Sequence, residues 1–390
     1  MAIGFWRLSQ GPVSLAFLTP AVQQALSQFD SPLEIEVQDT VLSWGGWDRA
    51  VDIVIKNVTL RQPGESPAVV LPEVSVGLSI RALGRGEIAP TSLEIFSPEI
   101  LVRRHADGRF SFGLTAQDLE KSDEAPVSMS VLDAFMRPPD PDSRLAYLTK
   151  VSILNATVTV SDQIAGLTWQ MPQSNIILVR EGNELRGNVS SILTAAGQET
   201  PVSAVMLRSL DTRAMSFTLS FQDFDPALVA RAIPEASFLK DVRTSLTGSV
   251  KANLLLDGRP KDAEINLRGD FGRIVLDLDL DEKTPVLTAG LKLFDVDTKR
   301  LASISPLLAD LKPLSTRLDG TAALTTTTAG EIIAADFALT GGQGELDLTE
   351  FDLEPLSLRG VALAGRVDAD LQSIVLEEAR VDFLDLIVPL

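Results

Sequence analysis

The sequence contains no cysteine, one histidine and one tyrosine among its 390 residues. The absence of cysteine excludes disulfides, thiol catalysis and cysteine-ligated zinc or iron–sulfur clusters. The single histidine, His105, excludes the HExxH zinc proteases and any other site that needs two imidazoles. The sequence also lacks GxGxxG, GxxxxGK[ST] and GxSxG, the usual signals of nucleotide-binding proteins and α/β-hydrolases. We therefore predict no catalytic residue, no cofactor and no metal site.

Basic residues are scarce relative to acidic ones, with 34 Lys and Arg against 53 Asp and Glu and a net charge of -19. Such a chain is a poor partner for a phosphate backbone, so we expect no binding to nucleic acid. The mean hydropathy is nevertheless +0.17. No window reaches the roughly 18 uninterrupted apolar residues of a membrane-spanning helix. The surplus of apolar residues is therefore expected to be buried or to line an apolar surface.

Apolar and polar residues alternate with a period of two from residue 33 onward, which predicts mainly β structure with short helices. A helix is expected over residues 12–29, and helical insertions are expected near 226–242 and 298–312. We expect the strands to form an elongated, curved, repetitive antiparallel sheet with an apolar groove. The residues predicted to face this groove are Ile53, Ile55, Val74, Val76, Leu78, Ile80, Ile274, Leu276, Leu278 and Leu280.

Composition divides the chain into three parts. Residues 1–115 read as an N-terminal helix followed by a β-sheet domain. Residues 116–145 are rich in charge and proline, and we interpret them as a linker with short helices. Residues 146–390 read as a repetitive β body.

An internal repeat supports the description of the body as repetitive. Residues 221–272 align without gaps on 293–344, and fourteen of the 52 aligned positions are identical. The identities include Asp223 with Asp295 and four pairs of glycines. Repeated units that cannot bury an apolar face alone share one continuous face when they stack. We predict units at about 221–292 and 293–364.

One cluster of carboxylates is a candidate for chemistry. Asp277, Asp279 and Asp281 alternate with leucines, so they share the opposite face of their strand. Such carboxylates could bind a cation or act as an acid/base pair in a polysaccharide hydrolase. The solvated outer face of a half-buried strand explains them as well.

Several segments in collinear order resemble AsmA-like, YhdP-type proteins of the Gram-negative bacterial envelope. They are RLSQGPVSLAFLTPAVQQAL (7–26), LSWGGWDRAVDIVIKNVTL (42–60), residues 71–114, VSILNATVTVSDQIAGLTWQMP (151–172) and LTGSVKANLLLDG (246–258). The resemblance covers nearly the whole chain, although each motif alone is degenerate.

This resemblance implies a bridge-type lipid transfer protein with no catalytic activity. Phospholipid acyl chains would move along a β-groove between the inner and outer membranes. The resemblance also implies an inner-membrane anchor with the bulk of the protein in the periplasm. The anchor is absent or truncated here, where residues 2–6 look like its end. A periplasmic scaffold that binds envelope proteins and assists outer-membrane biogenesis remains the alternative.

Overall fold

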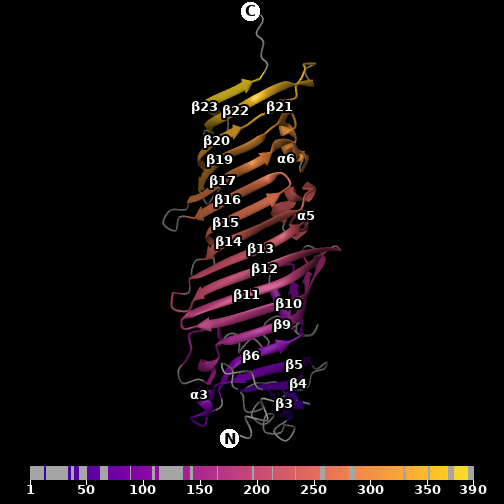
Figure 1. Cartoon of the computed structure of the whole chain (residues 1–390), viewed down its shortest axis with the longest axis vertical. Coiled ribbons are helices and arrows are strands. Elements are labelled where there is room, and N and C mark those ends of the chain that lie inside the picture. The colour runs from indigo at the N-terminus through magenta and orange to yellow at the C-terminus, as the bar shows by residue number, and fades with distance from the viewer. Residues whose placement is uncertain are drawn as a thin grey trace, which may run out of the picture. The chain divides into compact units, whose positions relative to one another are not determined.

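The computed structural model describes strands, helices and turns over much of the chain (Figure 1). The described residues are 13–14, 34–36, 39–43, 51–61, 69–87, 89–107, 110–113, 135–140, 144–164, 166–195, 197–212, 214–232, 234–254, 260–280, 286–304, 306–327, 331–349, 352–367 and 373–384.

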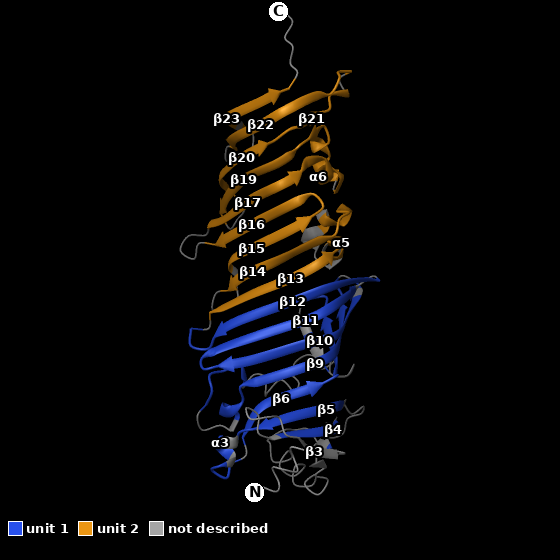
Figure 2. Cartoon of the chain, in the orientation of Figure 1, with its two compact units in different colours: residues 1–213 blue, residues 214–390 orange. Residues whose placement is uncertain are grey.

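The chain forms two compact units, residues 1–213 and 214–390 (Figure 2). Strands dominate both units, which confirms the prediction of mainly β structure. The two units separate at residue 213, inside the stretch expected to be one repetitive body. Most of the predicted linker, 116–134, lies outside the described residues, and its end at 135–140 and 144–145 belongs to unit 1.

In its described part, unit 1 contains one sheet and the short helical segments α3 (Ile80–Leu83) and η2 (Arg144–Tyr147), of which η2 is a 3-10 helix. Its strands are β1 (Val13–Ser14), β2 (Glu34–Glu36), β3 (Asp39–Ser43), β4 (Val51–Arg61), β5 (Val69–Leu78), β6 (Pro90–Phe96), β7 (Glu99–Arg104), β8 (Phe110–Gly113), β9 (Lys150–Asp162), β10 (Leu167–Glu181), β11 (Glu184–Ala195) and β12 (Gln198–Ser209). The predicted helix over 12–29 lies outside the described residues, apart from the two residues of β1.

Unit 1 departs from the predicted antiparallel sheet at β9. This strand pairs in parallel with β6 and with β7, whereas the remaining described pairs of unit 1 are antiparallel. Parallel neighbours need a long crossover connection, and the chain between Gly113 and Lys150 provides it. Strands β6 and β7 flank Ser97, which has a φ of 50°, and they lie along successive halves of β9.

Residues with a left-handed backbone conformation interrupt several strands of unit 1. Asn57 in β4, Asn155 in β9 and Gln173 in β10 have φ values of 50°, 55° and 56°. The pairing of β9 with β10 shifts register on both sides of Ser174. The side-chain amide of Asn155 donates to Ser97 Oγ at 3.0 Å, which joins two of the bends. Such bulges locally bend a strand and increase its twist.

Unit 2 is antiparallel throughout its described pairs. Nine of its strands pair in the order β13–β14–β15–β16–β17–β19–β20–β22–β23. The two short strands β18 and β21 pair with each other, and β21 also pairs with β22. The strands are β13 (Met215–Phe224), β14 (Leu246–Leu254), β15 (Pro260–Gly269), β16 (Gly272–Leu280), β17 (Val286–Asp297), β18 (Leu314–Ser315), β19 (Arg317–Thr327), β20 (Ile332–Gly341), β21 (Gly344–Leu346), β22 (Leu356–Val367) and β23 (Ile374–Phe383).

Helical insertions follow β13 and β17, as the sequence predicted. They are α5 (Ala227–Ala232) with the 3-10 helix η3 (Pro234–Asp241), and α6 (Thr298–Ile304) with the 3-10 helix η4 (Pro306–Leu311). Both insertions lie at the same side of the strands (Figure 1). Ile304 of α6 joins Phe271 and Val296 in a buried cluster. Ile274 and Leu293 pack against this cluster, so α6 covers one end of β16 and β17.

The structure reproduces the sequence repeat in detail. Asp223 and Asp295, which are 72 residues apart, both have a φ of 51°. The adjoining register shifts are also 72 residues apart, between Phe221 and Phe224 and between Leu293 and Val296. Gly272 begins β16 and its equivalent Gly344 begins β21. The equivalence ends soon afterwards, because β16 has nine residues whereas β21 has three.

The repeated glycines mark places where no side chain fits. A Cβ on Gly248 would lie 2.3 Å from the backbone oxygen of Asn266, and one on Gly320 would lie 2.5 Å from that of Ala338. Gly272 has a φ of 124°, and a Cβ there would lie 2.5 Å from the Asp295 oxygen. Contacts below 3.0 Å force the backbone to shift, which explains why the same positions carry glycine in both copies.

Candidate functional site

The strand register of unit 2 gathers apolar residues on one face of the sheet. Residues directly opposite each other on neighbouring strands share a face, and alternate residues along a strand return to it. Three neighbouring rows of paired residues cross all nine strands from β13 to β23 without a polar side chain, and we call them the apolar rows. The helix-side row is Phe221, Gly248, Leu267, Ile274, Leu293, Gly320, Leu339, Leu363 and Ala379. The middle row is Leu219, Val250, Ile265, Leu276, Leu291, Ala322, Phe337, Gly365 and Leu376. The outer row is Phe217, Ala252, Ala263, Leu278, Ala289, Leu324, Ala335, Val367 and Ile374.

The apolar rows are not covered as a protein core is. Every side chain in these rows whose burial the structure describes is partly or fully exposed, and Gly365 is the only buried position. Leu376 in the middle row is 53% exposed. The described cover is the cluster around α6, which touches the helix-side row at Ile274 and Leu293.

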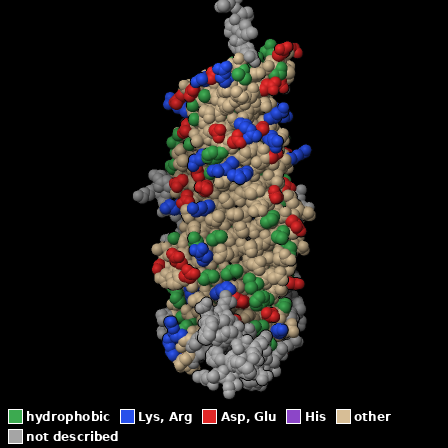
Figure 3. Space-filling view, viewed as in Figure 1, with side chains coloured by type: hydrophobic (Ala, Val, Ile, Leu, Met, Phe, Trp, Pro, Cys, Tyr) green, Lys and Arg blue, Asp and Glu red, His purple; other side chains and the backbone are tan. Residues whose placement is uncertain are grey.

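The opposite face of unit 2 is polar. On β15 and β16, Glu264 lies opposite Asp277 and Asp262 lies opposite Asp279. Figure 3 shows charged side chains spread over the face of unit 2 that is turned to the viewer, with few apolar ones between them. Unit 2 is therefore an amphipathic sheet.

The carboxylates proposed for chemistry lie on this polar face. Lys292 Nζ donates to Asp277 Oδ2 at 2.7 Å, and this hydrogen bond raises the pKa of the lysine. Asn253 Nδ2 donates to Asp262 Oδ1 at 2.6 Å. Asp277, Asn253 and Asp262 line a hollow of about 330 Å³ together with Asp279. Asp281 lies outside the described residues. Among the residues that are described, no group of three or more His, Asp or Glu side chains is placed to hold a metal ion.

Unit 1 has two apolar rows of its own, and they contain several of the predicted residues. The first row of unit 1 is Ile53, Val76, Leu93, Val151, Leu178, Gly187 and Met206. The second row of unit 1 is Ile55, Val74, Ile95, Ile153, Ile176, Val189 and Ala204.

The predicted residues fall into five groups. Ile55 and Val74 are paired and buried, whereas Ile53 and Val76 are paired and half-buried. Leu78 lies opposite Val51 at the end of β5. The prediction that Ile80 continues the alternation is wrong, because the strand ends at Leu78 and Ile80 begins α3. The predicted residues of β16 are all half-buried, and they are Ile274, Leu276, Leu278 and Leu280.

Sequence reasoning missed most members of the rows of unit 2. Leu219, Val250, Leu291 and Phe337 extend the middle row on either side of Leu276. The repeat offers one signal, because Leu267 and Leu339 are equivalent and both lie in the helix-side row. The assignment of the other residues to one face required the register.

Neither a family model, a curated protein nor a solved structure matches this chain. Among the helices that the structure describes, none has the length and apolarity needed to cross a membrane.

Proposed function

We propose that this chain is a non-catalytic lipid-binding protein that holds phospholipid acyl chains against the apolar rows of unit 2. The observation that carries the proposal is the combination of two properties of these rows. They contain no polar side chain across nine strands, and their described side chains stay partly exposed instead of being fully buried as in a core. An apolar ligand would complete the burial that the protein itself does not supply.

The size of the surface supports this proposal. Nine strands about 4.8 Å apart span roughly 38 Å, and three rows of alternate residues span about 13 Å. The projected area is on the order of 500 Å², comparable with the largest apolar patches of monomers, which often mark binding sites. Burying methylene groups contributes about 0.8 kcal/mol each, so eight of them would contribute at most roughly 6 kcal/mol.

The proposed role is lipid transfer between the inner and outer membranes of the bacterial envelope, with phospholipid as cargo. This part rests on the resemblance of the sequence to AsmA-like proteins. The bends at Asp223 and Asp295, with α6 at one end of the strands, would shape the apolar face into a groove. Acyl chains would lie in this groove, and the polar face would meet water.

A scaffold that binds envelope proteins by strand addition is the second candidate, and β23 favours it. Among the described strands, β23 pairs only with β22, and Val375, Leu376 and Val381 are exposed. Charged residues and the register shift near Glu377 nevertheless protect this edge against pairing. We therefore place lipid binding first.

Native mass spectrometry of the chain purified from bacterial membranes and incubated with phosphatidylethanolamine vesicles tests the proposal. The wild type is expected to carry phospholipid. The double variant Leu276→Lys/Leu278→Lys is expected to lose it, because charge enters the middle and outer rows. Asp279→Lys is the matched control, because it adds a lysine to the polar face of the same strand.

A lipid-free wild type would overturn the proposal, as would a folded double variant that binds as much lipid as the wild type. A double variant that lacks lipid yet preserves cellular function would favour the scaffold.

A further inference from the structure

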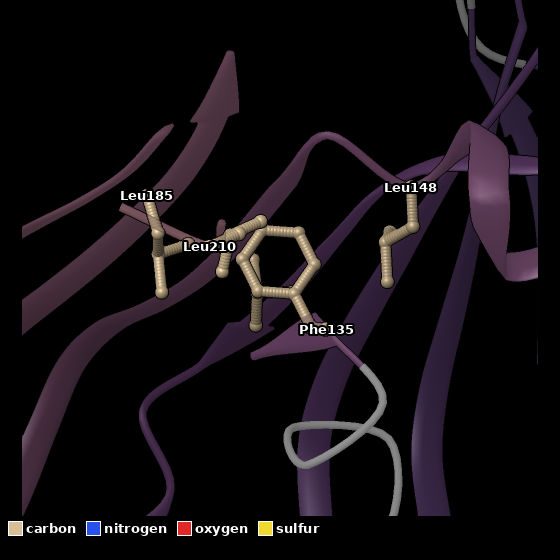
Figure 4. Packing of buried hydrophobic residues seen from close by; sticks show 5 residues of the cluster. Phe135, Leu148, Leu185 and Leu210 are labelled. Carbon is tan, nitrogen blue, oxygen red and sulfur yellow. The ribbon is translucent and has the colours of Figure 1, made fainter. Parts of the chain in front are cut away.

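In unit 1, the chain covers part of its own apolar surface. Residues 135–140 and 144–148, which we call the strap, precede β9. Phe135 and Leu148 of the strap are each only 2% exposed, and they form one cluster with Val151, Leu185 and Leu210 (Figure 4). Leu93, Leu178 and Met206 pack against this cluster. These three residues and Val151 belong to the first row of unit 1, so the strap lies on that row.

The cover is partial on both rows of unit 1. Leu93, Leu178 and Met206 of the first row stay half-buried under the strap, and in the second row only Ile55 and Val74 are buried, in a cluster of their own. In the second row of unit 1, Ile95, Ile153, Ile176, Val189 and Ala204 are half-buried. They continue the same face of the same strands as the residues under the strap. The strap therefore occupies one part of a longer apolar surface.

The sequence of the strap suits a detachable cover. Pro138 and Pro139 cannot donate backbone hydrogen bonds, so the segment cannot join the sheet as a strand at that point. Its polar anchor is Arg180, which lies at the end of β10 and is 5% exposed. Arg180 Nη2 donates to the carbonyl oxygens of Leu145 and Leu148 at 3.2 and 2.5 Å.

This anchor holds the strap without a described carboxylate partner. The guanidinium also donates to the carbonyl of Ala146 and stacks on the Phe135 ring. Burial lowers the pKa of Arg180, because the charged form is removed from water. The cost of burying this charge offsets part of the binding of the strap.

We infer that the first row of unit 1 is a second acyl-chain site, which the strap closes when no lipid is present. The inference rests on the proposed function, since it assigns the same ligand class to a second surface. Phe135 and Leu148 of the strap make apolar contacts with this row. An acyl chain could make apolar contacts with the same residues along its whole length. Lipid and strap would then exclude each other.

Phe135→Ala removes the largest apolar contact of the strap and should expose the first row. With phosphatidylethanolamine vesicles as the probe, native mass spectrometry is expected to find more bound lipid on Phe135→Ala than on the wild type. Leu358→Ala is the control, because Leu358 is equally buried but lies in unit 2 outside the apolar rows. It should show no gain in bound lipid.

A second measurement leaves Phe135 intact. The chain has no cysteine, so Arg137→Cys/Arg186→Cys places one spin label on the strap and one on β11. Both positions are exposed. Double electron–electron resonance should give one distance between the two labels without lipid, and an additional, longer distance with vesicles.

The outcomes separate the two proposals. If the wild type binds lipid, but Phe135→Ala gains none and the label distance is unchanged, the strap is a permanent part of the core and the inference is wrong. If neither the wild type nor Phe135→Ala binds lipid, the proposed function fails and this inference fails with it. A gain in lipid together with the longer distance supports both.

Discussion

The guanidinium carbon of Arg180 lies 5.0 Å from the centre of the Phe135 ring, and both side chains are almost fully buried. A cation over an aromatic face is attracted by the ring quadrupole, more strongly when water is excluded. The same guanidinium donates to three backbone carbonyls of the segment before β9. One side chain of β10 thus fixes both ends of the strap.

Arg180→Ala should therefore destabilise unit 1. Leaving buried carbonyls without donors costs about 1–3 kcal/mol, and the lost ring contact adds to this. We expect the free energy of unfolding in urea to fall by about 2–4 kcal/mol. The free energy of unfolding should fall less in Arg180→Lys, because the ammonium group keeps the positive charge and three hydrogen-bond donors. Equal stability of Arg180→Ala and the wild type would contradict this account of the anchor.

The glycines of the repeat predict a steric contrast within unit 2. Gly248→Ala would place a Cβ 2.3 Å from the Asn266 oxygen, whereas Gly290→Ala would find its nearest atom at 3.8 Å. We expect Gly248→Ala to lower the free energy of unfolding by about 2 kcal/mol or more, and Gly290→Ala to change it by less than about 0.5 kcal/mol. Urea unfolding of both variants checks the contrast. Similar losses in the two would show that the close approach is relieved by small backbone shifts.

Two neighbouring residues of β16 test whether the apolar rows are open to water. Leu276 is half-buried in the middle row, and Val275 on the opposite face is 5% exposed. In delipidated protein, Leu276→Lys should cost about 1 kcal/mol, because the ammonium reaches water. Val275→Lys should cost about 3 kcal/mol or more, because it buries a charge. The reverse order in thermal or urea unfolding would show that the rows are a closed core.

The charge pair at the end of β23 makes a prediction about pH. Arg380 donates to Asp382 from Nε at 3.2 Å and from Nη2 at 2.6 Å, which lowers the pKa of Asp382 below its ordinary 3.8. The folded state thus has the lower pKa, so this contribution to stability is complete above the ordinary pKa. It is lost as the pH falls through the lowered value.

Arg380→Gln should raise the pKa of Asp382 toward 3.8, as measured by NMR titration of the carboxyl carbon. Asp347 serves as an internal control, because its pKa is lowered by hydrogen bonds from Thr349 and should not change. A wild-type Asp382 that titrates at its ordinary value would show that the pair does not persist in solution.

Much of the fold could be predicted from local patterns. The alternation of Leu276, Leu278 and Leu280 with Asp277 and Asp279 determines a strand with one apolar face, because side chains alternate across a strand. The helical insertions after β13 and β17 and the repeat of Asp223 in Asp295 were also readable from the sequence. Ile80 shows the limit of such reading, since alternation cannot locate the residue at which a strand gives way to a helix.

The sequence by itself determined that the chain is rich in strands, lacks the residues of many enzymes and has more apolar side chains than its charge suggests. It did not determine which strands lie side by side. Pairing brings Leu219, Leu276 and Phe337 into one row although they are distant in the chain, and the parallel pairing of β9 depends on a crossover that no local pattern encodes. Burial depends on those same non-local contacts. Only the tertiary structure therefore decided that the rows of unit 2 stay partly exposed, and that the strap packs on the first row of unit 1.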